Sequence, residues 1–212
     1  MIGILGGTFN PIHHGHLRLA IEARERLGLR EVRLVPAAMP PLRAVPAVPA
    51  RTRLDWVRRA IAGEPGLVAD GRELARPGPS YTVDTLRELR AESGREPLCL
   101  LLGQDAARRL PRWHRWRELL DLSHLVVFHR PGEPERFPRA LVAALRGRRA
   151  ASPARLRHRP AGLWLRCPLP PLAVSATDIR RRLRERRSVR GLVPDAVIHR
   201  FTPRDLRALG HE

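Results

Sequence analysis

Two histidines near the start of the chain have the side chains and the spacing to bind phosphate. His13 and His16 stand on either side of Gly15, shortly after an apolar run that ends in two glycines. Imidazole nitrogens can donate hydrogen bonds to phosphate oxygens, and a glycine lets a phosphate approach the backbone. A helix that begins here would also present backbone N–H groups, which suit an anion. The pattern therefore predicts a phosphate site.

Other interpretations of this segment stay open on the residues alone. The segment lacks the Gly-Lys-Ser/Thr of a P-loop and does not match Gly-x-Gly-x-x-Gly. A glycine turn with ordinary surface histidines would have the same sequence. Three histidines within four residues could also bind a metal, but no carboxylate or cysteine accompanies them, so we predict no metal held by the protein. The position of the histidines after a strand favours phosphate, because open sheets bind ligands there.

A second candidate phosphate site lies near the C-terminus. Ser175 and Thr177 open an expected helix and can cap it, and Arg180 follows about one turn later. The same hydroxyls, with Arg180, could hold a phosphate, although a simple N-cap beside a solvated arginine explains the pattern equally well. The chain has 40 arginines and no lysine, so any cationic side chain that contacts phosphate must be an arginine.

Short apolar runs alternate with amphipathic segments along the chain. We expect strands at 2–5, 31–35, 98–102, 125–128 and 163–165. We expect helices at 15–27, 51–62, 80–91, 137–145 and 178–187, and one or two more within 193–209. This alternation predicts an α/β fold, a doubly wound parallel sheet of Rossmann-like type with helices on both faces and a small C-terminal helical part. Residues 147–159 are interpreted as a surface loop, and 1–212 as a single domain.

Composition narrows the function classes further. A chain of 212 residues with 43% hydrophobic residues can bury a sizeable core, which excludes a disordered protein. Its two cysteines form no Cys-x-x-Cys pair, so a zinc knuckle or a disulfide framework is unsupported. No signal peptide or membrane span is evident, and we expect a cytoplasmic protein without a membrane partner.

The formal net charge of +19 indicates an anionic partner without identifying it. A nucleic-acid-binding protein is the remote alternative. Positive charge alone is unspecific, the aromatic content is only 4%, and no helix-turn-helix, zinc-finger or RNA-recognition pattern is present. The sequence leaves the oligomeric state open, a homo-oligomer included.

Seven motifs taken together resemble a known family. The His-x-Gly-His and Ser-x-Thr-x-x-Arg elements are typical of the nucleotidyltransferase superfamily. Between them lie Pro-Ala-Ala-Met-Pro-Pro-Leu-Arg at 36–43, Pro-Ser-Tyr-Thr-Val-Asp-Thr-Leu at 79–86, Leu-Gly-Gln-Asp at 102–105, Leu-Pro-Arg-Trp-His-Arg-Trp at 110–116 and His-Leu-Val-Val-Phe-His-Arg-Pro-Gly at 124–132. In order and spacing, nearly the whole chain resembles bacterial nicotinate-nucleotide adenylyltransferases. The elements around Tyr81 and Trp113 are the substrate-specific ones.

The resemblance implies a reaction. Members of the family join ATP and nicotinate mononucleotide to give nicotinate adenine dinucleotide (deamido-NAD) and pyrophosphate, with Mg²⁺, in NAD biosynthesis. The mononucleotide phosphate attacks the α-phosphorus directly and in line, and no activated nucleophile is evident in this sequence to suggest otherwise. The alternative is a sister nucleotidyltransferase that uses nicotinamide mononucleotide or another phosphate-bearing acceptor, such as phosphopantetheine or glycerol phosphate.

The resemblance also implies site residues. His13 and His16 would contact the ATP phosphates, and His16 would stabilise the charged transition state. The residues implied to line the nucleotide crevice are Gly7, Thr8 and Phe9, and those implied to hold the triphosphate are Ser175, Thr177 and Arg180. The residues implied for the nicotinate nucleotide are Thr82, Thr85, Asp105 and Trp113, with Trp113 stacked on the pyridine ring.

The chain departs from the family pattern at three positions. The family commonly has His-Lys after the double proline, where this chain has Leu42 and Arg43, and we hypothesise that Arg43 replaces the lysine in binding ATP phosphate. Ala176 stands where the family commonly has a second serine, which removes one hydroxyl. Asn10 stands where aspartate is common, which weakens the case for a carboxylate metal ligand there.

Overall fold

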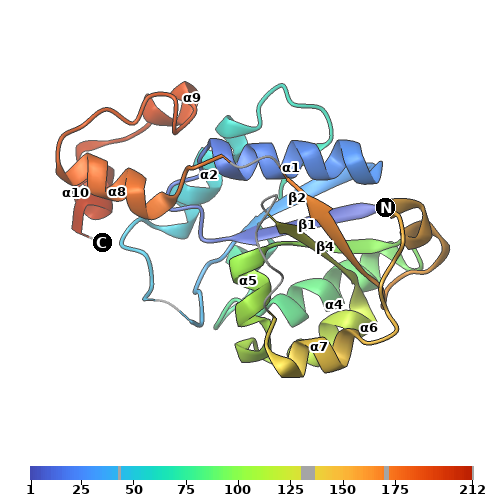
Figure 1. The fold of residues 1–212 in the computed structure, drawn as a ribbon. Helices are drawn as coiled ribbons and strands as arrows, with labels where there is room; N and C mark the ends of the chain where they lie inside the picture. The colour runs from blue at the N-terminus through green and yellow to red at the C-terminus, as the bar shows by residue number, and fades with distance from the viewer. Residues whose placement is uncertain (43, 130–136, 170–171, 212) are drawn as a thin grey trace. The chain divides into compact units, whose positions relative to one another are not determined.

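The fold is described here from a computed structural model that covers residues 1–42, 44–129, 137–169 and 172–211. Six strands form one sheet in the order β3-β2-β1-β4-β5-β6 (Figure 1). Their bounds are β1 Ile2–Gly7, β2 Glu31–Pro36, β3 Leu67–Ala69, β4 Leu98–Gly103, β5 His124–His129 and β6 Trp164–Pro168. The pairs β1–β4, β4–β5 and β5–β6 are parallel, with Ile2 opposite Leu98 and Leu125 opposite Trp164. This order is that of a doubly wound sheet.

Helices connect the strands. Their bounds are α1 His14–Leu27, α2 Ala50–Ala60, α3 Arg72–Ala75, α4 Thr82–Ser93, α5 Gln104–Arg109, α6 Leu119–Leu122, α7 Arg139–Leu145, α8 Ala176–Arg184, α9 Asp195–Ile198 and α10 Pro203–His211. The part of the chain that the structure describes also contains the 3₁₀ helices η1 Leu110–Arg112, η2 Trp116–Glu118 and η3 Pro153–His158. None of the helices among the described residues is both long and apolar enough to cross a bilayer.

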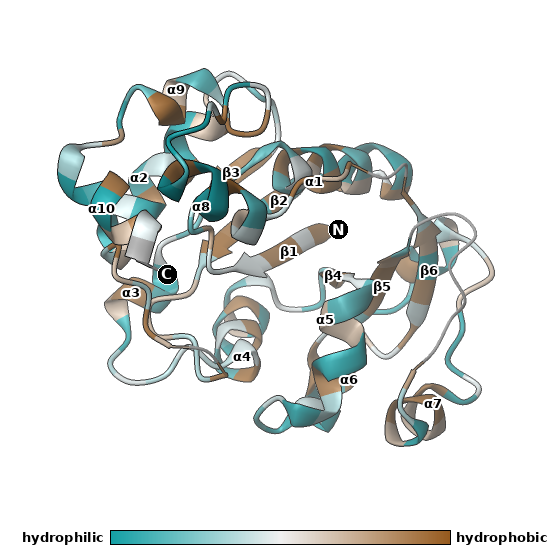
Figure 2. Ribbon diagram, turned by 60° about the vertical axis from the view of Figure 1, so that its left-hand side comes forward, coloured by the Kyte–Doolittle hydropathy of each residue, from teal (hydrophilic) through white to brown (hydrophobic). Residues whose placement is uncertain are grey.

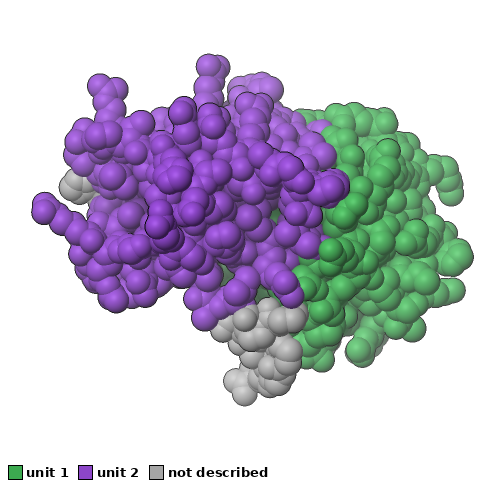
Figure 3. Space-filling model, turned by 90° about the horizontal axis from the view of Figure 1, so that it is seen from above, with its two compact units in different colours: residues 1–5, 22–33, 81–171 green, residues 6–21, 34–80, 172–212 purple. Residues whose placement is uncertain are grey.

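The chain divides into two compact units (Figure 3). Unit 1 comprises Met1–Leu5, Glu22–Arg33 and Tyr81–Pro171, and unit 2 comprises Gly6–Ile21, Leu34–Ser80 and Leu172–Glu212. In unit 1, α4 and α6 lie on one face of the strands and the end of α1 on the other (Figure 1). Strands β4 and β5 are apolar along most of their length (Figure 2), as expected for strands covered on both faces.

Unit 2 has an apolar core of its own. Helix α2 contacts β3 and α9, and α8 contacts α10. The indole of Trp56 on α2 is fully buried and meets the ring of Phe201 edge-on, with 5.0 Å between the ring centroids. Helix α2 therefore has a face that points into this core, and residues four apart on that face share its environment.

The predicted α/β class, doubly wound parallel sheet and helical C-terminal part are confirmed. The interpretation of 147–159 as a surface loop is wrong in part. Residues 153–158 form η3, Leu156 is fully buried, and Arg149 makes a parallel bridge with Trp164. This helical turn was not predicted because the segment is rich in arginine and has a single inward-facing leucine. The single nucleotidyltransferase domain over 1–212 stays a prediction.

Candidate nucleotide site

The loop from Gly6 to His16, here called the histidine loop, joins β1 to α1 within unit 2. Two glycines of this loop lie directly under aromatic rings. A Cβ atom on Gly7 would lie 3.1 Å from the ring of Phe9, and one on Gly15 would lie 3.0 Å from Nδ1 of His13. Both aromatic rings thus fold closely over a glycine, and a larger residue at either position would push the ring away by a few tenths of an ångström. Gly7 and Gly15 therefore allow the close packing of the rings of Phe9 and His13 in this loop.

The structure brings the two predicted histidines into contact. The rings of His13 and His16 are stacked with 3.7 Å between centroids, and the ring of Phe9 meets His16 edge-on at 4.9 Å. The backbone N–H of His13 donates a hydrogen bond to Nδ1 of His16 at 3.3 Å. Because Nδ1 accepts this bond, neutral His16 carries its proton on Nε2. His16 can therefore donate a hydrogen bond from Nε2.

Both histidines are held in the neutral form. Burial, and to a smaller extent the neighbouring His14, lower the pKa of His13 from 6.5 to about 4. Burial and the adjacent His13 lower the pKa of His16 well below 6.5. At neutral pH the pair therefore consists of two uncharged imidazoles, which bind an anion by donating hydrogen bonds rather than by positive charge.

The low pKa of His13 predicts that acid destabilises the fold. The unfolded chain takes up a proton on His13 near pH 6.5, whereas the folded chain does so only near pH 4, so stability falls as the pH drops below 6.5. The contribution of His13 is on the order of 3 kcal/mol and is fully lost below about pH 4. Urea unfolding at pH 7.5, 6.0 and 5.0 measures it, with His13→Asn as the comparison. Parallel pH profiles for the two proteins would contradict the assignment.

Helix α8 brings an arginine to the histidine loop. Nη1 of Arg180 donates a hydrogen bond to the carbonyl oxygen of Asn10 at 2.9 Å. Its Nε is buried and has no hydrogen-bond partner among the residues that the structure describes. Buried donors are normally satisfied, so a donor left over in a side chain bound to the histidine loop suits an anionic ligand. Within unit 2, Arg180 therefore contacts the loop that carries His13 and His16.

Ser175 and Thr177 have less distinctive surroundings. Oγ of Ser175 accepts a hydrogen bond from the backbone N–H of Asp178 at 3.1 Å, so Ser175 is the N-cap of α8. Thr177 is exposed on the first turn. Helix α8 is strongly hydrophilic (Figure 2), with Ile179 as its buried residue. The N-cap interpretation of this motif thus accounts for Ser175 in the structure described here.

The residues predicted to bind the nicotinate nucleotide all lie in unit 1. Thr82 is the first residue of α4 and is half-buried. Thr85 is only 1% exposed. The side chain of Asp105, on α5, is 90% exposed and pairs with Arg108 at 3.2 Å. Trp113 follows η1 and is half-buried, whereas Trp116 is buried in the core.

Two aromatic side chains beside these residues were not predicted as site residues. The rings of Tyr81 and His114 are stacked with 4.2 Å between centroids. Tyr81 directly precedes Thr82, and His114 directly follows Trp113. The stack therefore joins the two sequence elements that the family resemblance marked as substrate-specific. Their adjacency to the predicted residues was the available signal.

The loop after β2 is held by a serine of the same unit. Oγ of Ser80 accepts hydrogen bonds from the backbone N–H groups of Ala38 and Met39, at 2.9 and 3.1 Å. The N–H of Ala37 donates to the carbonyl of Gly7 at 2.9 Å, so this loop also lies against the histidine loop. The predicted phosphate ligand Arg43 is outside the described residues.

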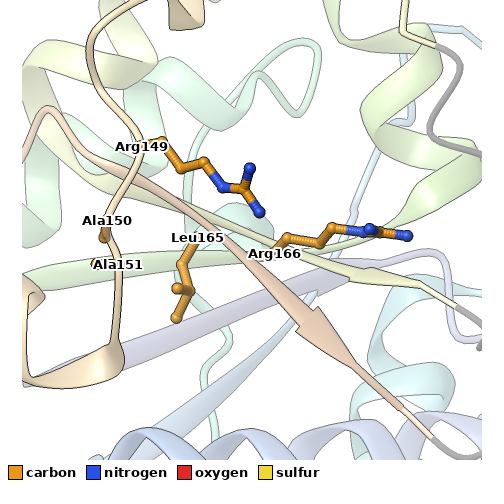
Figure 4. Close-up of a pocket in the computed structure, with 5 residues that line it drawn as sticks. All are labelled: Arg149, Ala150, Ala151, Leu165 and Arg166. Carbon is orange, nitrogen blue, oxygen red and sulfur yellow. The ribbon is translucent and has the colours of Figure 1, made fainter.

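The described residues form no group of three histidine, cysteine, aspartate or glutamate side chains that could hold a metal ion. A separate cavity of about 350 Å³ lies in unit 1 and is lined by Arg149, Ala150, Ala151, Leu165 and Arg166 (Figure 4). None of the predicted site residues lines it. The predicted site therefore does not involve this cavity.

Comparison with known proteins decides the family. Residues 4–182 match the cytidylyltransferase-like family. A protein of Halorhodospira halophila named probable nicotinate-nucleotide adenylyltransferase is 54% identical over 199 residues, which are 94% of this chain and 91% of the relative. A protein of the same name from Methylococcus capsulatus is 48% identical over 93% of this chain and 95% of its own length. The chain belongs to the nicotinate-nucleotide adenylyltransferase family.

Solved structures agree with this family in fold. Plasmodium falciparum nicotinic acid mononucleotide adenylyltransferase, complexed with NaAD, has a TM-score of 0.70 at 13% identity, covering 93% of this chain and 92% of that one. A structure described as a putative nicotinate-nucleotide adenylyltransferase from Vibrio parahaemolyticus has a TM-score of 0.61 at 18% identity, covering 100% and 95%. The Rossmann-like fold predicted for the chain is thereby confirmed. Nicotinate-nucleotide adenylyltransferases are nucleotidyltransferases, a class that generally uses a divalent metal ion.

Proposed function

We propose that this protein transfers the adenylyl group of ATP to nicotinate mononucleotide, giving nicotinate adenine dinucleotide and pyrophosphate in NAD biosynthesis. Curated relatives with this name are about half identical to the chain over nearly its whole length. The observation that carries the proposal is the neutral histidine pair in a loop that Arg180 also contacts, with a buried Nε left unsatisfied. These groups can donate several hydrogen bonds to phosphate oxygens, which suits direct transfer between phosphates.

In the proposed reaction, a phosphate oxygen of nicotinate mononucleotide forms a bond to the α-phosphorus of ATP. The bond from that phosphorus to the oxygen bridging to the β-phosphorus breaks, and pyrophosphate leaves with the electron pair. Nε2–H of His16 donates to a non-bridging α-phosphate oxygen as negative charge grows there. Arg180 holds the leaving phosphates with its free donor. Catalysis then consists of positioning and charge stabilisation.

Further residues have assigned parts in the proposed site. His13 donates to the ATP phosphates, and Gly7, Thr8 and Phe9 line the nucleotide crevice. Ser175 and Thr177 add contacts at the start of α8. The divalent ion is proposed to be Mg²⁺, which neutralises phosphate charge when bound. Asn10 offers an amide where a carboxylate would hold such an ion, so the residues fit an ion that enters on the ATP phosphates.

The acceptor is proposed to bind in unit 1, against Thr82, Thr85, Asp105 and Trp113. A carboxylate on the pyridine ring needs hydrogen-bond donors, and hydroxyl and backbone N–H groups at the start of α4 can supply them. The protein is further proposed to be a single domain. Its cytoplasmic location stays a prediction.

The reaction is tested by identifying its products. Purified protein with Mg²⁺, ATP and nicotinate mononucleotide is expected to release one pyrophosphate for each dinucleotide formed, with the dinucleotide identified by mass. Direct transfer also predicts that ATP alone leaves no AMP on the protein. Absence of turnover would refute the proposed function, and an adenylylated protein intermediate would refute direct transfer.

Truncating Trp113 is expected to weaken acceptor binding selectively. Loss of a stacked ring removes about 1–3 kcal/mol, so Trp113→Ala should raise KM for nicotinate mononucleotide about tenfold or more. KM for ATP should change less than twofold, and Trp113→Phe should keep most of the affinity. Steady-state kinetics with each substrate varied in turn measures both constants. An equal rise in the two KM values would contradict stacking.

The arginine that replaces the family lysine is also open to test. Arg43→Ala is expected to raise KM for ATP about five- to tenfold through loss of a charged phosphate contact, whereas Arg43→Lys should restore it to within twofold. Arg58→Ala on the exposed side of α2 is the control for removing one positive charge. If Arg43→Ala has the wild-type KM, the replacement hypothesis fails.

A further inference from the structure

One arginine of unit 2 is buried, which is unusual for a charged side chain. Arg53 lies on α2 and is 1% exposed. Its guanidinium donates hydrogen bonds to three backbone carbonyl oxygens, those of Thr8 at 2.6 Å, Val48 at 3.1 Å and Ala38 at 3.4 Å. A buried charge is retained only where its hydrogen bonds compensate for lost hydration. The planar fork of an arginine presents three separate nitrogens to these carbonyls, whereas the donors of a lysine all lie on one nitrogen.

The three carbonyls belong to three different segments of the chain. Thr8 is in the histidine loop, Ala38 is in the loop after β2, and Val48 precedes α2. The first two loops also meet through the bond from Ala37 N–H to the Gly7 carbonyl. Arg53 therefore fixes the histidine loop to the loop after β2 from the buried side of both.

The contact to Thr8 acts on the histidine pair through one peptide group. In a trans peptide the carbonyl and the next N–H point in opposite directions, so holding the Thr8 oxygen also sets the direction of the Phe9 N–H. Phe9 has φ +48, in the left-handed region that bulky residues avoid. Such a conformation persists only where neighbouring bonds hold it. The ring of Phe9 in turn packs edge-on against His16.

From this chain of contacts we infer that Arg53 is a positioning residue of the adenylyl-transfer site. Its guanidinium holds the Thr8–Phe9 peptide in the strained conformation that orients the phosphate-facing backbone and the ring of His16. The inference rests on the proposed function, because it assigns the histidine loop to ATP. It adds a buried residue that touches no substrate and acts through the loop.

The test compares two arginines that both bind backbone carbonyls. Arg90 donates to the carbonyls of Gly94, Glu96, Leu122 and Pro160 in unit 1, at 2.7 to 2.8 Å, and serves as the matched control. Arg53→Lys and Arg53→Met are measured beside Arg90→Lys and Arg90→Met. The readouts are Tm, kcat, KM for each substrate and the Kd of a non-hydrolysable ATP analogue.

A role in positioning predicts that Arg53→Lys raises KM and Kd for the ATP ligand about tenfold, and that Arg53→Met raises them more. KM for nicotinate mononucleotide should change less than threefold. The Arg90 variants should lose Tm while keeping both constants for the ATP ligand within twofold. Nitrogen-15 spectra of the histidine rings should show His16 leaving the Nε2–H tautomer in Arg53→Lys.

Several results would overturn the inference. Wild-type KM and Kd in a folded Arg53→Lys protein would do so, as would equal changes in the Arg90 variants or an unchanged His16 tautomer. If Arg53→Met does not fold, Arg53→Lys alone decides the question. Failure of the proposed function appears instead as a wild-type protein without turnover, a result that the binding and tautomer measurements do not depend on.

Discussion

Replacing His16 by alanine is expected to lower kcat about 100- to 1,000-fold. In the proposed site the Nε2–H of His16 donates to an α-phosphate oxygen, because its Nδ1 already accepts a hydrogen bond from the backbone N–H of His13. Removing one donor that acts on a developing oxyanion costs this much in other enzymes. KM for ATP should rise much less than kcat falls, since the bond strengthens as charge develops. Steady-state kinetics at saturating substrates measures the effect.

Two further substitutions test the contributions of the two ring nitrogens of His16 separately. Asparagine can keep an acceptor near the Nδ1 position, and glutamine can place a donor near the Nε2 position. We expect His16→Gln to recover about tenfold over alanine and His16→Asn to recover little. Thermal unfolding of the three variants controls for loss of the stacked pair, which we expect to cost about 1 kcal/mol. Near wild-type kcat in His16→Ala, or recovery by asparagine alone, would contradict the assignment.

Arg180→Ala is expected to raise KM for ATP about 10- to 100-fold. A charge-assisted contact to phosphate contributes about 1.5–3 kcal/mol, and the buried Nε of Arg180 has a donor to give. Arg180→Lys should recover only part of the loss. The guanidinium can bind the Asn10 carbonyl and a phosphate through different nitrogens of its planar fork, whereas a lysine has one nitrogen for both. Substrate-saturation curves for ATP with fixed nicotinate mononucleotide give the values.

The neighbouring arginine provides the control for this prediction. Arg181 lies on the same helix but is 47% exposed and paired with Asp178 and Glu185. Exposed ion pairs contribute little, so Arg181→Ala should keep KM for ATP within twofold. If both alanine variants raise KM alike, the effect belongs to the charge of α8 as a whole and the role of Arg180 is contradicted.

Periodicity predicted the fold well where apolar residues recur at regular spacing. The buried run 98–102 became β4, and the stripe of Leu54, Val57 and Ile61 became α2 and its C-cap. Short elements carry too few apolar residues to show a period, so β3 and α3 were not predicted. The turn of η3 was missed for the same reason, because it buries only Leu156.

The site, like the fold, could be predicted from the sequence only in part. The histidine pair and Arg180 could be named from motifs, but their neutral state and their contacts depend on burial that only the folded chain has. Arg53 was missed because arginine normally signals a solvated position. Its place four residues before the buried Val57 was the available signal, since residues four apart share a helix face.

The central claim is the identity of the acceptor, and a direct competition of two acceptors tests it. Pyrophosphate release from ATP is measured with nicotinate mononucleotide and with nicotinamide mononucleotide, each over a full concentration range. The proposal predicts turnover with the acid and a kcat/KM at least tenfold higher than with the amide, because donors at the start of α4 would bind a carboxylate more strongly than a neutral amide. A higher kcat/KM for the amide would contradict the acceptor assignment, and no turnover with either would contradict the function.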